Sequence, residues 1–213
     1  MPGKDETDIK GIPVKSTYPD SPSVVVLYAT FTSVVSIIAG TFAYFAIVKN
    51  NATADAKIAI LSEYDFGYLY MAAFILKLGQ FSMGINLGSA RKESKVNVPD
   101  QQVYQVKGAE GSKLGYVLLE YDGVIGRFNR AQRAVQNYNE TFPQNALYIL
   151  LGGFVYPKEV MVLATIFAVA RVVSAIGYTG GADGRLGGFM LSNVAVTIIE
   201  ALVVISGYRA IQM

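Results

Sequence analysis

The sequence predicts an all-α integral membrane protein, with a four-helix antiparallel transmembrane bundle preceded by one extra N-terminal transmembrane helix. The first observation is composition, because apolar residues make up 52% of the 213 residues and charged residues only 16%. A soluble domain carries about a quarter charged residues. The second is length, because five stretches approach the roughly 20 apolar residues that cross a bilayer. They are residues 24–48, 66–89, 128–156, 160–178 and 186–206.

The first of these stretches, residues 24–48, carries no charge and is the clearest span. It is not typical of a signal peptide, because the apolar run is too long and the polar segment before it contains several acids. The sequence therefore predicts three parts. Residues 1–23 form a polar N-terminal tail, residues 24–48 the extra transmembrane helix, and residues 61–213 the four-helix bundle.

The other four stretches carry polar groups. The third is polar before Pro143 and apolar after it, while the last two contain Arg171 and Glu200. A charge in the hydrocarbon core costs about 2.5–3.5 kcal/mol, so we expect Arg171 and Glu200 to form a structural ion pair. The one long connection, residues 97–127, suits either a β-hairpin or a short amphipathic surface helix.

Lys and Arg are unevenly distributed between the two sides of the predicted membrane. Ten lie in the N-terminal tail and in the connections after the second and fourth spans, against four on the opposite side. Positive residues favour the cytosol, so the N-terminus is predicted there and the C-terminus across the membrane. A net charge of +2 without a basic run excludes a nucleic-acid partner.

The chain contains no Cys and no His. Their absence excludes disulfides, thiolate metal sites, a cysteine nucleophile and the commonest general base. Any thiol chemistry must therefore use a thiol that a substrate or cofactor brings.

A stripe of polar residues marks the start of the third span. Arg133, Asn137 and Glu140 are spaced i, i+4 and i+7, so they share one helix face. A guanidinium, an amide and a carboxylate in a row suit a small zwitterionic ligand. The same residues also suit a salt-bridge and hydrogen-bond network between helices, and the sequence leaves both interpretations open.

Three segments resemble the MAPEG family, the membrane-associated proteins of eicosanoid and glutathione metabolism. They are residues 84–92, 128–143 and 170–185, within a similarity that extends from residue 61 to about residue 207. Within the family they are most similar to the microsomal glutathione transferase 3 branch. The resemblance implies a four-helix antiparallel bundle that forms a homotrimer and binds glutathione between protomers near the cytosolic face.

The resemblance also implies a set of site residues. Glutathione would be bound by Arg133, Asn137, Glu140, Tyr178 and Arg185, with Arg91 supplied by the neighbouring protomer. Lys92 matches the position of a proposed proton donor, and Arg185 is the best candidate for the cation that favours the thiolate. Alternatively, Arg91, Lys92 and Arg185 are only positively charged anchors on the cytosolic side.

The implied function is that of a membrane-bound glutathione transferase or peroxidase acting on lipophilic electrophiles or lipid hydroperoxides. The expected location is the endoplasmic reticulum or another organelle membrane. Val135, Thr141 and Ser174 depart from the family pattern, as do the extra span and the long connection. These departures favour the alternative of a non-catalytic lipid-binding or scaffold protein. One form of this alternative is an accessory subunit of a larger membrane complex.

Overall fold

The computed structural model describes residues 7–8, 12–106 and 117–213. Most of the described chain is helical, which confirms the predicted all-α membrane bundle. The helices are α1 (Val24–Ala43), continued by the π-helical turn η1 (Tyr44–Val48), α2 (Ala52–Glu63), α3 (Gly67–Ser94), α4 (Gly123–Val155), α5 (Pro157–Gly180), the 3-10 turn η2 (Ala182–Arg185) and α6 (Leu186–Gln212). The strands are β1 (Tyr104–Val106) and β2 (Val117–Leu119).

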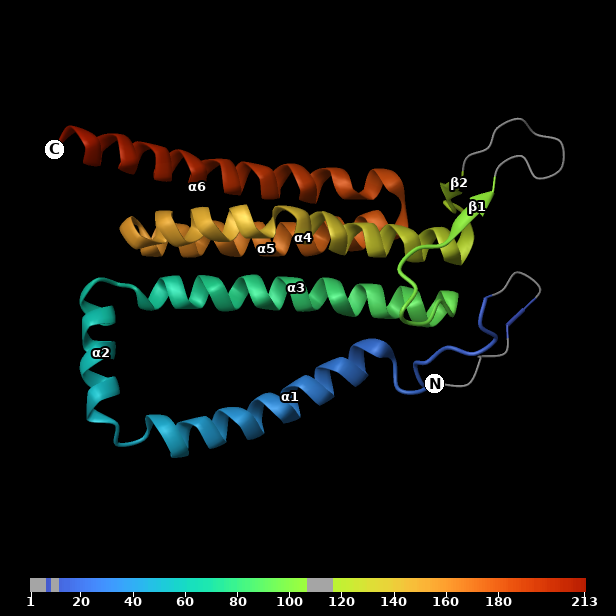
Figure 1. The fold of residues 1–213 in the computed structure, drawn as a ribbon, viewed down its shortest axis with the longest axis horizontal. Coiled ribbons are helices and arrows are strands. Elements are labelled where there is room, and N and C mark those ends of the chain that lie inside the picture. The colour runs from blue at the N-terminus through green and yellow to red at the C-terminus, as the bar shows by residue number, and fades with distance from the viewer. Residues whose placement is uncertain (1–6, 9–11, 107–116) are drawn as a thin grey trace.

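Helices α3 to α6 form the bundle, with α5 packed against each of the other three (Figure 1). Helices α4 and α6 run in the same direction, and α5 runs antiparallel to both. The first turns of α4 and α6 and the last turn of α5 therefore lie at the same end of the bundle. The start of α1 and the end of α6 lie at opposite ends of the bundle.

Four of the five predicted spans are long and apolar enough to cross a membrane by composition, and the chain is an integral membrane protein. They are Val24–Val48, Gly67–Ser94, Pro157–Gly180 and Ala182–Gln212. Helix α4 falls outside this group because its first half is polar, although its 33 residues extend about 50 Å. It packs lengthwise on α3 and α5, and its polar half includes the buried side chains of Asn129 and Gln132.

Small residues allow close helix packing. A Cβ built on Gly153 would lie 2.5 Å from Leu69 Cδ1, and one on Gly152 would lie 3.3 Å from Ile199 Cγ2. Both glycines therefore lie where helices pack closely. At Gly84, by contrast, nothing in the described chain lies within 4 Å of a Cβ.

Helix α2 was not predicted. Asn51 caps it, since its Oδ1 accepts a hydrogen bond from the Ala54 N–H at 3.0 Å. Its apolar and polar residues are distributed around the helix so that no face is apolar, and none of its residues is buried. The periodicity that reveals amphipathic helices is therefore missing from its sequence.

The long connection contains a β-hairpin, which decides between the two predicted alternatives. Strand β1 pairs antiparallel with β2, with Gln105 opposite Leu118, and residues 107–116 lie outside the described chain. Asn129 of α4 anchors the hairpin. Its Nδ2 donates to the carbonyls of Val103 (2.7 Å) and Glu120 (2.9 Å), and its Oδ1 accepts from the Val103 N–H.

The extra helix α1 contacts the bundle only near its start. Tyr28 lies edge-on to Phe81 of α3, with ring centroids 6.2 Å apart. Beyond this point α1 diverges from α3 (Figure 1), and its apolar side chains are exposed in the single chain. Phe31 and Phe42, for example, retain 66% and 71% exposure.

Candidate functional site

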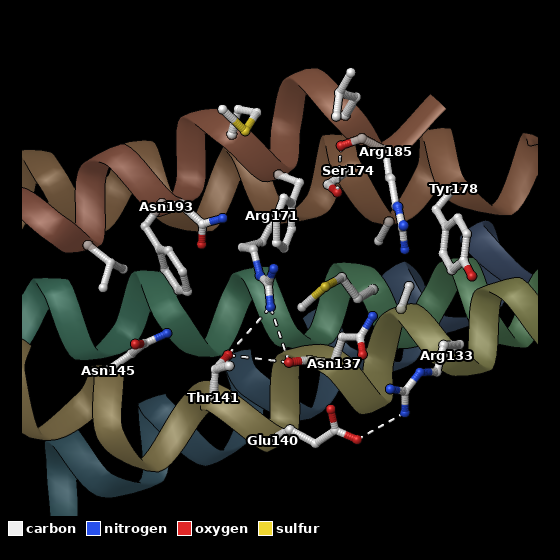
Figure 2. Close-up of a pocket in the computed structure, with 18 of the residues that line it drawn as sticks. Arg133, Asn137, Glu140, Thr141, Asn145, Arg171, Ser174, Tyr178, Arg185 and Asn193 are labelled. Carbon is white, nitrogen blue, oxygen red and sulfur yellow. Dashed lines mark hydrogen bonds and ion pairs between the residues drawn. The ribbon is translucent and has the colours of Figure 1, made fainter. Parts of the chain in front are cut away.

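A cavity of about 730 Å³ lies between α4, α5 and α6, and Figure 2 shows the side chains that line it. Helix α5 provides its floor, while α4 and the η2–α6 segment form its two walls. Five of the seven predicted site residues line this one cavity: Arg133, Asn137, Glu140, Tyr178 and Arg185. They come from two helices and a turn separated by as many as 52 positions in the sequence.

The helical spacing of the α4 stripe brings two opposite charges together. Arg133 Nη1 lies 3.0 Å from Glu140 Oε1, and the two side chains are 42% and 54% exposed. An ion pair with this exposure stabilises the fold by about 0.2–1 kcal/mol at most. Both groups are therefore available to a charged ligand at little cost to the protein.

The tight turn after α5 places the second arginine. Gly177 and Gly184 approach so closely that a Cβ on Gly184 would lie 2.3 Å from the Gly177 carbonyl oxygen. The Arg185 guanidinium carbon consequently lies 5.0 Å from the centre of the Tyr178 ring, a cation–π contact. Ser174 Oγ donates to the Arg185 carbonyl at 3.0 Å and fixes the backbone of the turn.

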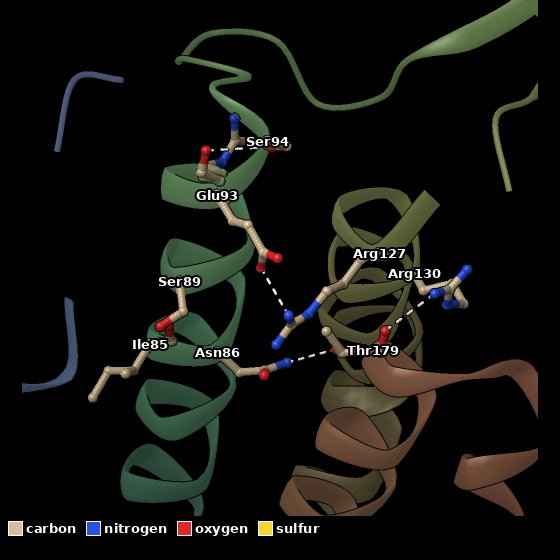
Figure 3. A network of polar contacts seen from close by, with 9 residues as sticks. Ile85, Asn86, Ser89, Glu93, Ser94, Arg127, Arg130 and Thr179 are labelled. Carbon is tan, nitrogen blue, oxygen red and sulfur yellow. Dashed lines mark hydrogen bonds and ion pairs between the residues drawn. The ribbon is translucent and has the colours of Figure 1, made fainter. Parts of the chain in front are cut away.

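A polar network holds the last turn of α5 in place (Figure 3). The Arg130 guanidinium donates to the carbonyls of Tyr178 (3.1 Å) and Thr179 (3.3 Å), where a helix C-terminus carries unpaired acceptors. Asn86 Nδ2 donates to Thr179 Oγ1 at 2.7 Å, which connects α3 to the same turn. The last turn of α5, which carries Tyr178, is thus held from two neighbouring helices.

Arg171 lines the same cavity but does not pair with Glu200, so the predicted ion pair is wrong. Its Nη2 donates to the Asn137 carbonyl at 3.2 Å and lies 3.4 Å from Thr141 Oγ1 (Figure 2). Carbonyl and aromatic partners satisfy the buried guanidinium, with the Phe167 ring centre 5.9 Å away. The partner is a backbone atom of α4, which no sequence pattern identifies.

The structure does not bring the remaining two predicted residues to the cavity of this chain. Arg91 is buried, and its guanidinium donates to the carbonyls of Val96 (3.1 Å) and Asp100 (2.6 Å) and to Gln132 Oε1 (3.3 Å). Lys92 Nζ donates to the Asp20 carbonyl at 2.7 Å. Within the described chain both residues bind the loop or the tail at the end of α3.

The tail segment before α1 contacts this end of α3. The Thr17 N–H donates to Asn97 Oδ1 at 2.8 Å, and Asn97 Nδ2 donates to the Lys15 carbonyl at 3.0 Å. Burial, followed by the hydrogen bond with Tyr28, raises the pKa of the Tyr18 hydroxyl to about 12. Tyr18 therefore stays neutral and supplies no charge there.

The positions that depart from the family pattern have different surroundings. Val135 packs against the hydrophobic core and does not line the cavity. Thr141 lines the cavity, and its Oγ1 donates to the Tyr138 carbonyl at 3.2 Å. Ser174 lines it as well and holds the η2 turn, so its hydroxyl has a structural partner.

Sequence analysis missed several polar residues of the cavity, namely Gln144, Asn145, Asn193, Thr197 and Glu200. A signal for three of them was present. Asn193, Thr197 and Glu200 are spaced i, i+4 and i+7 on α6, which is the same spacing as the stripe on α4. The strongly apolar average of this span hid the pattern.

A comparison with protein-family models identifies the family to which the chain belongs. The model of the MAPEG family matches residues 69–205, which covers α3 to α6 and the cavity but excludes α1 and α2. Since this match includes more than half of the sequence, the chain belongs to the MAPEG family.

Proposed function

We propose that the protein binds glutathione in the cavity and acts as a membrane-bound glutathione transferase or peroxidase, as expected of the microsomal glutathione transferase 3 branch. One observation carries the proposal. The five side chains that the family resemblance implies as site residues of one protomer line a single cavity of about 730 Å³. Membership of the MAPEG family supports the same ligand.

The charges of the cavity complement those of glutathione. The ligand has two carboxylates, one ammonium and a thiol. Arg133 and Arg185 offer guanidinium groups, which bind carboxylates through paired hydrogen bonds. Glu140 offers a carboxylate to the ammonium, and Asn137 offers an amide that donates and accepts.

Arg185 is the proposed activating cation. A free cysteine thiol has a pKa of about 8.5, and a fixed positive charge beside the sulfur lowers it. The thiolate then attacks an electrophilic carbon, and the leaving group departs with its bonding electrons. With a hydroperoxide, the thiolate instead attacks the outer oxygen, the O–O bond breaks, and the alkoxide takes a proton. A second glutathione converts the resulting sulfenic acid to a disulfide and water.

The test compares Arg185→Ala with Arg133→Ala. Loss of a close cation in a partly desolvated site raises the pKa of the bound thiol by about one to three pH units. Arg185→Ala should therefore lower thiolate absorbance and turnover at neutral pH, and both should recover as the pH rises. Arg133→Ala should mainly weaken binding in calorimetry, with less recovery. If Arg185→Ala leaves the thiolate titration unmoved, the activating charge lies elsewhere, and Lys92 and Arg91 are the next candidates.

A second candidate function is that of a lipid-binding or scaffold subunit in a larger membrane complex. The observation in its favour is α1, an apolar helix with little contact to the bundle that the family match does not cover. In this proposal residues 61–213 form the bundle and residues 24–48 contact a partner. A folded protein that binds no glutathione at millimolar concentration favours this second function over the enzyme.

A further inference from the structure

The side chain of Arg130 connects three parts of the chain beside the cavity. Each guanidinium nitrogen donates to a backbone carbonyl, Nε to that of Tyr178 (3.1 Å), Nη2 to that of Thr179 (3.3 Å) and Nη1 to that of Tyr121 (2.7 Å). The first two carbonyls belong to the last turn of α5, and the third lies between β2 and α4. No carboxylate in residues 7–8, 12–106 and 117–213 forms an ion pair with Arg130. The guanidinium group is therefore used entirely to hold backbone.

The Tyr121 carbonyl is a fixed support for this guanidinium. A Cβ on Gly126 would overlap the Tyr121 carbonyl oxygen, so the segment after β2 folds directly onto the first turns of α4. Asn129 holds the same segment, because its Nδ2 donates to the carbonyls of Val103 and Glu120. With Nη1 bound to this support, the planar guanidinium directs its other two nitrogens at the end of α5.

The turn that Arg130 holds carries the ring that positions Arg185. The Arg185 guanidinium carbon lies 5.0 Å from the centre of the Tyr178 ring, and the guanidinium has no hydrogen bond or ion pair within the described part of the chain. The last carbonyls of a helix lack intrahelical partners, and such ends fray easily when nothing binds them. Arg130 also shares a small cavity of about 120 Å³ with Tyr178 and Arg133, so it adjoins two of the candidate ligand-binding side chains.

We propose that Arg130 is a positioning residue of the reaction. It holds the last turn of α5 and, through the Tyr178 ring, keeps the Arg185 guanidinium beside the glutathione sulfur. The attraction between two charges falls with their separation, so Arg185 favours the thiolate only while it stays close to the sulfur. The effect of Arg130 on the reaction rests on the proposed function, whereas its effect on the position of Arg185 does not.

The first measurement is hydrogen exchange of the full chain without glutathione. Arg130→Gln removes the three hydrogen bonds, and Arg127→Gln is the matched control. Arg127 lies three residues earlier on α4 and pairs with Glu93 of α3, with the two side chains 48% and 42% exposed (Figure 3). Residues 178–187 should exchange about 10-fold faster in Arg130→Gln, the value of one charged hydrogen bond, and at the parent rate in Arg127→Gln.

The second measurement is the thiolate titration of bound glutathione. Arg130→Gln should raise the pKa of the bound thiol by about one pH unit, which lowers the thiolate fraction at neutral pH by up to about 10-fold. In a chain that already carries Arg185→Ala, Arg130→Gln should add no further shift, because no guanidinium remains to be positioned. Arg130→Lys keeps the charge but offers one nitrogen in place of three, so it should shift the pKa in the same direction. It also serves as the test if Arg130→Gln does not fold.

Four outcomes overturn the inference. They are unchanged exchange of residues 178–187, a titration that Arg185→Ala moves but Arg130→Gln does not, additive shifts in the double variant, and parent behaviour of Arg130→Lys. The last would show that the charge of Arg130 acts without its geometry. A parent protein that binds no glutathione overturns only the proposed function, and hydrogen exchange then still tests whether Arg130 positions Arg185.

Discussion

Replacing Glu140 with glutamine tests whether the charges of the cavity complement those of glutathione. The variant keeps the size of the side chain and removes the only carboxylate on the Arg133–Asn137–Glu140 stripe. In the protein alone, Glu140 Oε1 pairs with Arg133 Nη1 at 3.0 Å. In the proposed complex, glutathione exchanges this ion pair for two contacts of its own, with its ammonium on Glu140 and a carboxylate on Arg133.

The magnitude follows from this exchange. A hydrogen bond to a charged group contributes about 1.5–3 kcal/mol. The broken ion pair offsets about 0.2–1 kcal/mol, because both side chains are more than one-third exposed. The variant has no ion pair to break, so the net loss is about 1.5 kcal/mol, or roughly 10-fold in affinity. The free energy of unfolding should fall by no more than about 1 kcal/mol, the most that an ion pair with this exposure contributes.

Calorimetry with two ligands isolates the contact. The second ligand is a glutathione analogue in which hydrogen replaces the ammonium group. The parent protein should bind the analogue about 10-fold more weakly than glutathione, and Glu140→Gln should not weaken the analogue further. Equal weakening of both ligands would show that Glu140 acts through the fold, and unchanged affinity for glutathione would remove Glu140 from the site.

Three further predictions concern the turn, the assembly and the topology. Gly184→Ala should displace Arg185 and reduce thiolate formation, because its Cβ would lie 2.3 Å from a backbone oxygen; Gly187→Ala, with nothing within 4 Å, is the control. Native mass spectrometry in mild detergent should show a homotrimer, and a monomer that still binds glutathione contradicts this. Protease protection of terminal tags should place the N-terminus in the cytosol and the C-terminus across the membrane; cleavage of both tags from one side refutes five crossings.

The polar stripe on α4 was predictable because it depends on helical spacing alone. Arg133, Asn137 and Glu140 share a face in any helix, and the structure places them along one cavity wall. The surroundings of Arg171 were not predictable in the same way. Its partner is the Asn137 carbonyl on a neighbouring helix, and only the packing of α5 on α4 brings the two together.

Average composition describes two of the helices poorly. Helix α4 is too polar to qualify as a span, yet it lies along the bundle because α3 and α5 cover its length. Helix α6 is apolar enough that its own polar stripe, Asn193 to Glu200, was overlooked. Averages over a span conceal polar residues that share one face, and these are the residues that line a cavity.

The absence of His and Cys leads to one more prediction, on pH dependence. His is the only side chain whose ordinary pKa lies between pH 5 and 8, and arginine stays charged throughout this range. The rate should therefore rise with pH through a single ionisation, that of the bound thiol, at a pKa below the free value of about 8.5. Arg185→Ala should move this one step upward without adding another. A bell-shaped profile in steady-state kinetics would instead require a second titrating group, and would refute this reasoning.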